Sequence, residues 1–356
     1  MSPAPHSRRD FLKGPAHFAP EPTAASSAEP TPIDNSYLIQ VGRTAMACQF
    51  EVLLNADAQK EASEVAIKAL DLVDKLEDKL SLYRDHSDLC RVNRLAAKEP
   101  QAVDDDLWEI LEYATQLYSR TNGAFDITSA PLSRLWGFHR RDGRIPDPEE
   151  ITQTLQQVGM HHLKLNAKQQ TVFFDRPEIE LDLGSLGKGF AIDQCRDLLR
   201  AAGVEDFLIH GGYSSVLAAG KRLSPEAPVH GWAIAVRDPY RPNHRLGRLV
   251  LKDQALGTSG LANQSFIYQG RRYGHILDPQ TGMPADRLVS VTVVSPIGMW
   301  ADALATAFFV MGPEAVHDYC QTHANIGALL LVQTSNLGTY EIELVGIAAE
   351  KWLPDA

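Results

Sequence analysis

The sequence predicts an α+β fold in which mixed sheets carry flanking helices. Strand-like and helix-like segments follow one another irregularly, whereas a doubly wound parallel sheet needs a regular βαβ alternation. Hydrophobic residues make up 44% of the 356 residues and charged residues 22%, a composition that supports a packed core. No internal repeat is visible, so we expect one large folded domain.

The first 36 residues differ in composition from the rest of the chain. Seven of the 21 prolines lie among the first 34 residues, with alanine, serine, glutamate and threonine between them. Because such a segment cannot bury a core, we expect a disordered leader at 1–36 and a folded domain at 37–356.

The leader contains Arg8-Arg9, which resembles a twin-arginine export signal. A signal of this kind needs an apolar stretch of about 7 to 15 residues after its basic part, and the following residues do not supply one. Two localisations stay open. The protein is exported to the periplasm if this leader works, and it is cytoplasmic otherwise.

The first elements of the domain follow from hydrophobic periodicity. Apolar residues alternate within 37–54, which predicts strand structure. They recur at helical spacing over 61–80 and again over 104–119, which predicts two helices. The run Asp104-Asp105-Asp106 stands where carboxylates favour the positive end of a helix dipole. We therefore interpret this acidic run as a helix cap and not as a metal site.

Further helices are expected at 187–203, which ends at a glycine, and at 300–311 and 313–323. Short strands are expected at 163–166, 171–174, 179–183, 206–210, 214–219, 231–236, 247–251, 264–268, 289–295, 326–332 and 339–345.

Charge and composition exclude several classes of protein. Thirty-four basic and 45 acidic residues give a net charge of −11, which argues against nucleic-acid binding through phosphate neutralisation. No apolar run approaches the roughly 20 residues of an integral membrane span. The cysteines form no C-x-x-C pair, so we expect buried free thiols at Cys48, Cys90, Cys195 and Cys320.

The densest group of candidate functional residues runs from Asp182 to Asp193. A strand-like segment leads into Gly184, Gly187, Lys188 and Gly189, and then into a helix. Glycines allow a close approach of the backbone, and a helix start offers free N–H groups to a phosphate. The spacing fits neither a Walker loop nor a dinucleotide fingerprint. An anion site and an ordinary tight turn both remain open.

A second group surrounds His275, which precedes the turn residues Asp278-Pro279 and Thr281-Gly282. This position predicts a histidine at a strand end, where its side chain reaches a cleft. Histidine is the natural general base near neutral pH, although a single histidine is more often structural.

A third group is Asp302 and Thr306, which lie four residues apart and share one face of the predicted helix. A carboxylate in such an apolar stretch is costly unless it is paired or bound to a metal. Carboxylate and hydroxyl oxygens suit a hard cation such as Mg²⁺. The alternative is a helix cap at Asp302 with Thr306 bonded back to the backbone.

Other segments are weaker candidates for the walls of a ligand site. One is the string Gly123-Ala124-Phe125-Asp126-Ile127-Thr128, which follows a predicted helix. Two more are the glycine-containing strings His210-Gly211-Gly212-Tyr213-Ser214-Ser215 and Thr258-Ser259-Gly260. Glycine turns usually serve chain reversal, and none of these is specific alone.

Taken together and in this order, the segments resemble the FAD:protein FMN transferase (ApbE-like) family from about Arg43 to about Gly312. The matching strings are Thr44-Ala45-Met46, Ser81-Leu82-Tyr83-Arg84 with Asp88 and Asn93, Gly123 to Thr128, Asp182-Leu183-Gly184 through Lys188-Gly189, Gly211-Gly212, Thr258-Ser259-Gly260, His275 to Pro279 and Ala301 to Thr306. No single string is specific, whereas the ordered set is.

The resemblance implies an ApbE-like, T-fold-related architecture and an Mg²⁺-dependent reaction. FMN would move from FAD to a serine or threonine hydroxyl of an acceptor flavoprotein, and AMP would leave. The residues implied to hold FAD are Met46, Tyr83, Ala124, Phe125, Asp126, Asp182, Lys188 and Ile276. The Ser185 carbonyl, Asp302 and Thr306 would hold Mg²⁺, and His275 would be the base.

The sequence departs from the family pattern at two places. Ala47-Cys48 follows Met46 where the family commonly has Gly-Thr, and Tyr213 follows Gly211-Gly212 where a small or polar residue is usual. Two alternative functions stay open: an FAD pyrophosphatase that gives FMN and AMP, and a flavin-binding protein without catalysis.

Overall fold

The computed structural model describes residues 37–56, 58, 60–223, 230–241, 243–261, 264–336 and 338–355. The chain divides into two compact units, Met1–Ile33 and Asp34–Ala356, and the described residues belong to the second. The leader expected at 1–36 lies outside the described residues.

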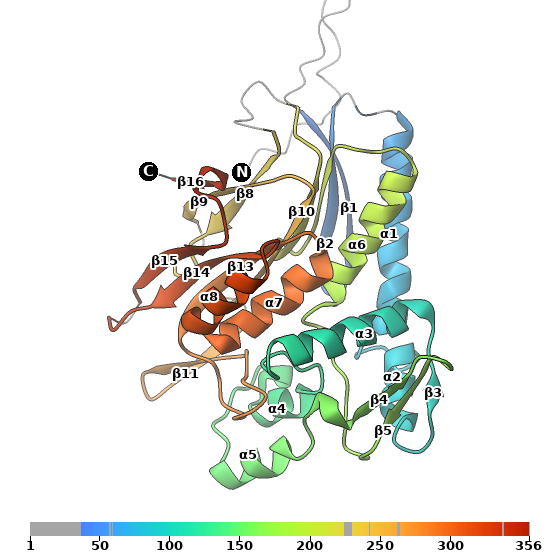
Figure 1. The fold of residues 1–356 in the computed structure, drawn as a ribbon, viewed down its shortest axis with the longest axis vertical. Helices are drawn as coiled ribbons and strands as arrows, with labels where there is room; N and C mark the ends of the chain where they lie inside the picture. Colours follow the sequence, from blue (N-terminus) through green and yellow to red (C-terminus); the bar gives the residue numbers. More distant parts are fainter. Residues whose placement is uncertain are drawn as a thin grey trace, which may run out of the picture. The chain divides into compact units, whose positions relative to one another are not determined.

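An eight-stranded antiparallel sheet forms the centre of the second unit, in the order β1-β2-β6-β7-β10-β13-β14-β15 (Figure 1). Its strands are β1 (Leu38–Ala45), β2 (Cys48–Asn55), β6 (Phe207–Gly211), β7 (Ser215–Ala219), β10 (Gln254–Gly260), β13 (Leu288–Ser295), β14 (Gly327–Gln333) and β15 (Tyr340–Val345). Both faces of the sheet are covered, so β6 and β7 are buried along their whole length.

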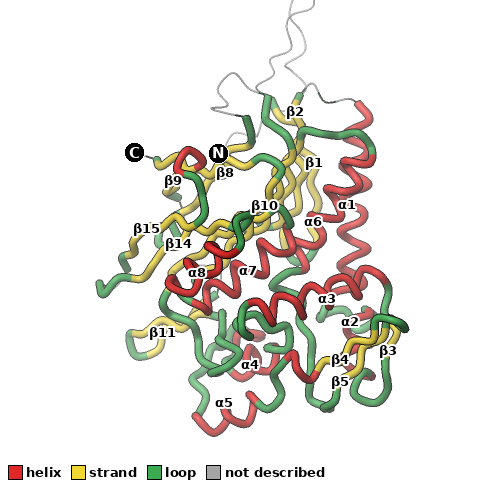
Figure 2. Tube along the Cα trace, viewed as in Figure 1, coloured by secondary structure: helices red, strands yellow, loops and turns green. Residues whose placement is uncertain are grey.

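Three long helices cover one face of this sheet: α1 (Lys60–Leu80), α6 (Gly187–Ala201) and α7 (Gly298–Met311). Helix α6 lies between α1 and α7, as Figures 1 and 2 show. The apolar stripe of α1 packs against inward-facing residues of the sheet such as Phe50, Val52 and Ile209. The remaining helices are α2 (Asp88–Leu95), α3 (Asp105–Arg120), α4 (Ala130–Leu135), α5 (Pro148–Leu155) and α8 (Pro313–Thr322), with short 3₁₀ turns at Phe138–Arg140, Met160–His162 and Ala349–Lys351.

A smaller sheet packs on the opposite face of the main sheet. Its order is β16 (Trp352–Pro354), β9 (Arg245–Leu251) and β8 (Trp232–Arg237). The contact is apolar: Trp232 and Leu249 of the small sheet pack with Leu256 and Leu329 of the main sheet. Two further sheets lie apart from it, β3 (Gln101–Ala102) with β5 (Thr171–Phe174) and β4 (Leu163–Asn166), and the hairpin β11 (Ser265–Tyr268) with β12 (Arg271–Gly274).

Most of the elements expected from periodicity are present, because their apolar faces are the ones buried in the core. Asp104 caps α3 by accepting a hydrogen bond from the Leu107 amide, which confirms the interpretation of the acidic run. All four cysteines are free thiols as expected, but only Cys90, Cys195 and Cys320 are buried, and Cys48 is half-buried in β2. Among the described helices, none is both long and apolar enough to cross a membrane.

Two sequence-based predictions were wrong. The segment 179–183 belongs to no sheet: the Asn93 side chain bonds to the backbone of Leu181 and the Ile127 carbonyl accepts from the Asp182 amide, where a strand would bond to a neighbouring strand. The string 258–260 is not a chain-reversing turn: it ends strand β10, where it pairs with residues of β13.

Asn93 holds this unpaired segment by two hydrogen bonds. Its amide nitrogen donates to the Leu181 carbonyl at 3.0 Å, and its amide oxygen accepts from the Leu181 N–H at 2.8 Å. Asn93→Leu leaves both groups of the buried Leu181 unsatisfied, so we expect it to lower the free energy of unfolding by about 2–4 kcal/mol. Asn93→Asp keeps the acceptor alone and should fall between the two proteins in a urea titration. Equal midpoints for all three would contradict this role.

Candidate active site

A cavity of about 490 Å³ lies where α6, α7, the end of β10 and the segment after β12 meet. Most of the predicted site residues line this cavity, although they are far apart in the sequence. Those that line it are Tyr83, Asp126, Asp182, Ser185, Lys188, His275, Ile276, Asp302 and Thr306.

Helices α6 and α7 touch backbone to backbone beside this cavity. A Cβ atom at Gly189 would clash with the Gly298 backbone, and one at Gly298 would lie 2.8 Å from the Gly189 carbonyl oxygen. Glycine at both positions therefore allows the close approach. The contact brings Lys188 of α6 next to Asp302 of α7.

Each of the two helices caps the other. The buried Asp193 of α6 accepts hydrogen bonds from the Gly298 and Met299 amides at the start of α7, at 2.8 and 2.9 Å. Asp302 of α7 accepts one from the Gly189 amide in the first turn of α6, at 2.8 Å. Carboxylates near helix N-termini are stabilised by the orphan N–H groups and the helix dipole. We call this arrangement the reciprocal caps.

Asp302 is a buried carboxylate with one oxygen already engaged. Its Oδ2 accepts from Gly189 and from the Ser215 hydroxyl at 2.7 Å. Burial raises the pKa of Asp302 to about 6, while the charge of Lys188 and the two hydrogen bonds oppose that rise. Within the described residues no hydrogen bond engages Oδ1, so this oxygen is available to a ligand. The alternative that Asp302 caps its own helix is wrong, because it lies inside α7 and caps α6.

Thr306 lies one turn beyond Asp302 on α7. Its hydroxyl contacts the Ser259 hydroxyl of β10 at 3.1 Å. The alternative that it bonds back to its own helix is therefore not what the side chain does. The carboxylate and hydroxyl oxygens of this corner are hard donors, the kind that Mg²⁺ prefers.

The first turn of α6 offers less to an anion than the glycine-rich string suggested. The Gly187 amide donates to the Leu183 carbonyl, and the Gly189 amide donates to Asp302. Lys188 is half-buried, and its ammonium forms no ion pair with any described residue. The lysine side chain, more than the helix amides, is the feature of α6 that can meet a phosphate.

His275 follows β12, as its position in the sequence predicted. Its Nδ1 lies 3.0 Å from the Gln264 carbonyl oxygen. A carbonyl only accepts, so Nδ1 carries the hydrogen and Nε2 keeps its lone pair. Burial lowers the pKa of His275 below its ordinary value, which keeps the ring neutral near pH 7. The geometry is that of an oriented general base.

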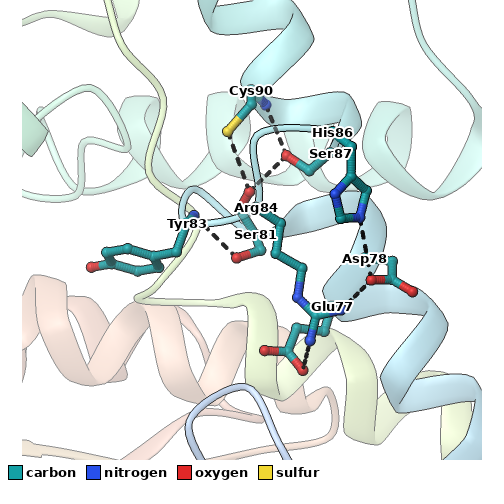
Figure 3. Close-up of polar contacts among 8 residues, drawn as sticks. All are labelled: Glu77, Asp78, Ser81, Tyr83, Arg84, His86, Ser87 and Cys90. Carbon is teal, nitrogen blue, oxygen red and sulfur yellow. Dashed lines mark hydrogen bonds and ion pairs between the residues drawn. The ribbon is translucent and has the colours of Figure 1, made fainter.

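Tyr83 stands at the entrance of the cavity on a rigid turn between α1 and α2, drawn in Figure 3. Arg84 bonds back to Glu77 and Asp78 of α1. Ser87 donates to the Ser81 carbonyl at 2.7 Å and caps α2. Figure 3 shows the Tyr83 ring pointing away from these contacts, and it is 76% exposed and stacked on His139. The polar network thus presents an aromatic face to a ligand.

The two acidic residues on this side of the cavity are engaged with the backbone. Asp126 accepts from Thr128 and from the Met160 amide, and burial raises its pKa. Asp182 accepts from the Gly184 amide at 2.8 Å, and burial raises its pKa as well. Both carboxylates therefore shape the loops that carry them.

Three residues of the predicted FAD set do not line the cavity. Phe125 is buried in the main core, and Ala124 is buried next to it. Met46 lies in the tight turn between β1 and β2, where Met46 and Ala47 have φ of 48° and 56°. This turn is close to the site, because the charges of Lys188 and Asp302 influence the pKa of Cys48, which burial raises.

The structure also brings in residues that the motifs did not single out as functional. Ser215 and Ser259 bond to the side chains of Asp302 and Thr306, and Gln264 orients His275. Both serines lie in strings that the sequence marked only as weak ligand walls. His139 and Arg141 line the cavity from a segment with no motif at all.

Comparisons with known proteins agree with this architecture. A model of the ApbE family matches residues 46–330. A FAD:protein FMN transferase of Vibrio cholerae serotype O1 is 33% identical over 270 residues, which cover 74% of this chain and 78% of that protein.

Solved structures match over most of the chain. The ApbE protein of Thermotoga maritima superposes with a TM-score of 0.76 at 26% identity, covering 87% of this chain and 97% of that one. The apo form of the flavinyl transferase ApbE of Pseudomonas stutzeri gives 0.75 at 28% identity, covering 87% and 95%. The α+β fold expected from the sequence is thereby confirmed. The chain belongs to the ApbE family.

Proposed function

We propose that this protein transfers FMN from FAD to a serine or threonine hydroxyl of an acceptor flavoprotein and releases AMP. Its relative in Vibrio cholerae carries the name of this activity. The observation that carries the proposal is that Lys188, His275 and the Asp302–Thr306 pair line one cavity. A free ammonium, a neutral base and hard oxygen donors are what phosphoryl transfer from a dinucleotide requires.

The bonds change as follows in this proposal. The acceptor oxygen forms a bond to the phosphorus on the FMN side of the diphosphate, and the bond from that phosphorus to the bridging oxygen breaks. The hydroxyl proton goes to Nε2 of His275, whose lone pair is free because Nδ1 donates to Gln264. AMP leaves with the bridging oxygen, and Lys188 offsets the negative charge that develops there.

Mg²⁺ is proposed as the cofactor on the chemistry of the donor set. The available Oδ1 of Asp302, the Thr306 hydroxyl and the Ser185 carbonyl are all oxygen donors. No group of three or more His, Cys, Asp or Glu side chains suited to a metal occurs among the described residues. One protein carboxylate fits Mg²⁺, which commonly completes its shell with water and substrate phosphates. When bound, the ion supplies charge neutralisation at the phosphoryl oxygens.

The direct test is a mass measurement on a candidate acceptor after incubation with this protein, FAD and Mg²⁺. An FMN-sized adduct on a serine or threonine supports transfer. AMP release at the same rate with and without the acceptor would instead indicate the FAD pyrophosphatase. FAD binding without either product would leave a flavin-binding protein.

The role of His275 predicts both a rate and a pH profile. Removing a general base costs about 10²–10⁴-fold in rate, so His275→Ala should slow transfer by that factor. Burial lowers the pKa of His275 below that of an ordinary histidine, so the base is neutral near pH 7 and is lost as the pH falls through the lowered pKa. The rate of the parent protein should therefore be flat near pH 7 and fall in acid.

His275→Ala should lose this acid limb of the profile, with initial rates at saturating FAD as the measurement. His275→Asn is a useful companion, because its amide nitrogen can take the place of Nδ1 and still donate to the Gln264 carbonyl, whereas it offers no ring nitrogen to accept the proton. An alanine variant that keeps the parental rate would show that another group takes the proton.

A further inference from the structure

A second hollow, of about 500 Å³, adjoins the active-site cavity on the other face of the main sheet. Its floor is the outer face of β6, β7, β10 and β13, and one wall is β8 followed by Pro239. The two hollows share Ser214 and Thr258. We call this second hollow the β8 groove.

The end of β10 connects the two hollows. Ser259 bonds to Thr306 of α7 on the helix side, whereas Thr258 bonds to Thr292 of β13 at 3.0 Å on the groove side. Successive side chains of a strand point to opposite faces, so one strand end serves both spaces. A molecule lying in the β8 groove can therefore extend around this end to the reacting phosphate.

The wall formed by β8 is a free strand edge. In the described part of the chain β8 pairs with β9 alone. Every residue from Ala233 to Pro239 lines the groove in succession, which is the pattern of an edge and not of one pleated face. The exposed residues of β8 are the small Ala233 and Ala235 and, at its end, Arg237, whose guanidinium lies over the Tyr213 ring, so another backbone can come close at the two alanines. An edge strand offers unpaired N–H and C=O groups to an incoming strand.

A buried polar atom in the groove also lacks a partner. His210 is 5% exposed, and its Nε2 lies 2.9 Å from the Glu51 carboxylate. Nε2 therefore carries the hydrogen of this contact. Nδ1 is buried without a hydrogen-bond partner among the described residues.

Tyr213 marks the junction of the two hollows. It has φ of 62°, an uncommon conformation for a bulky residue, and it is 59% exposed. Its ring stacks on His210 with centroids 4.5 Å apart, and the Arg237 guanidinium lies 5.2 Å from it. These contacts hold an exposed aromatic ring over the passage to Ser214, where the groove opens into the cavity.

We propose that the β8 groove binds an extended segment of the acceptor flavoprotein, which pairs with the free edge of β8 and presents its serine or threonine hydroxyl at Ser214 and Thr258. The inference rests on the proposed FMN transfer. A peptide is the occupant that uses an unpaired strand edge beside a hollow that shares Ser214 and Thr258 with the active-site cavity. The six residues of β8 span about 20 Å, enough for a short extended segment.

The test compares Ala235→Arg with Ile342→Arg. Ala235 is exposed on β8, and a long charged side chain there obstructs strand addition. Ile342 is 43% exposed on β15, the outermost strand of the main sheet away from the groove, and serves as the matched control. We expect Ala235→Arg to raise the KM for the acceptor by about tenfold or more, with FAD affinity unchanged. Ile342→Arg should change neither value.

Hydrogen exchange provides a readout that does not require chemistry. The probe is a recombinant acceptor flavoprotein subunit purified without its covalent flavin. Its addition should slow exchange of the amides in 232–237 and leave those in 340–345 unchanged. Unprotected β8 amides with a parent protein that transfers FMN would overturn the proposal. So would an Ala235→Arg variant that loses FAD affinity at an unchanged acceptor KM, because the groove would then belong to the dinucleotide.

The two proposals fail in different ways. A parent protein that gives no FMN adduct contradicts the transferase, and protection of β8 by the same acceptor still supports docking. An FMN adduct with an unprotected β8 contradicts the docking site and leaves the transferase intact.

Discussion

Asp302→Asn is expected to abolish FMN transfer while leaving the fold almost unchanged. Asparagine keeps the shape of the side chain, and its oxygen can still accept from the Gly189 amide and the Ser215 hydroxyl. It removes the negative charge that the proposed Mg²⁺ needs. We expect the transfer rate to fall on the order of 10³-fold, the size of effect seen when charge stabilisation at a reacting centre is lost.

Thermal unfolding separates the two roles of this residue. Mg²⁺ with FAD should raise the Tm of the parent protein, because a ligand that binds only the folded state stabilises it, and should not raise that of Asp302→Asn. Ser215→Ala is the control, since it removes one donor to Oδ2 and keeps the carboxylate. An asparagine variant with parental Mg²⁺-dependent transfer would remove Asp302 from the proposed metal site.

Gly189→Ala is expected to destabilise the protein and to reduce FMN transfer, although it adds only a single methyl group. The new Cβ would meet the Gly298 and Met299 backbone, which cannot move aside as a flexible side chain would. Overpacking of this kind costs about 1–3 kcal/mol and would force α6 and α7 apart. Because the Gly189 amide donates to Asp302, the separation would also displace the carboxylate and reduce transfer.

Gly187 gives a matched control in the same helical turn. A Cβ there would have no neighbour within 4 Å, and its φ is not in the left-handed region. Gly187→Ala should therefore be neutral or stabilising by up to about 1 kcal/mol, since alanine favours the helix. The measurement is the midpoint of urea unfolding, compared between the two variants and the parent protein. Equal midpoints for the two alanine variants would mean that the α6–α7 contact tolerates a side chain.

The sequence predicted the fold well wherever one face of an element is buried. Helix α1 and strand β13 carry their own hydrophobic period, so both were expected within one residue of their bounds. The segment at 179–183 has the same apolar alternation but no neighbouring strand, because Asn93 reaches it from a helix 88 residues earlier. Hydrophobic periodicity indicates which side chains are buried, but it does not indicate which groups form hydrogen bonds with the backbone of the segment.

Individual residues of the candidate site could be predicted from the sequence, whereas the contacts between them could not. Lys188, His275 and Asp302 were recognised from local strings, and all three line one cavity. That Asp302 caps a different helix depends on a contact across 113 residues, which no local pattern encodes. The orientation of His275 likewise comes from the Gln264 carbonyl, a backbone atom that any residue type would supply.

The reciprocal caps have a consequence for motion. Asp193 and Asp302 each close the end of the other's helix, so sliding α6 along α7 would expose buried amides on both sides at once. Lys188 and Asp302 are therefore held at a fixed spacing by the two helices that carry them. We therefore expect the α6–α7 junction to keep its geometry when a ligand binds, because separating the helices would leave the Gly189, Gly298 and Met299 amides without their acceptors.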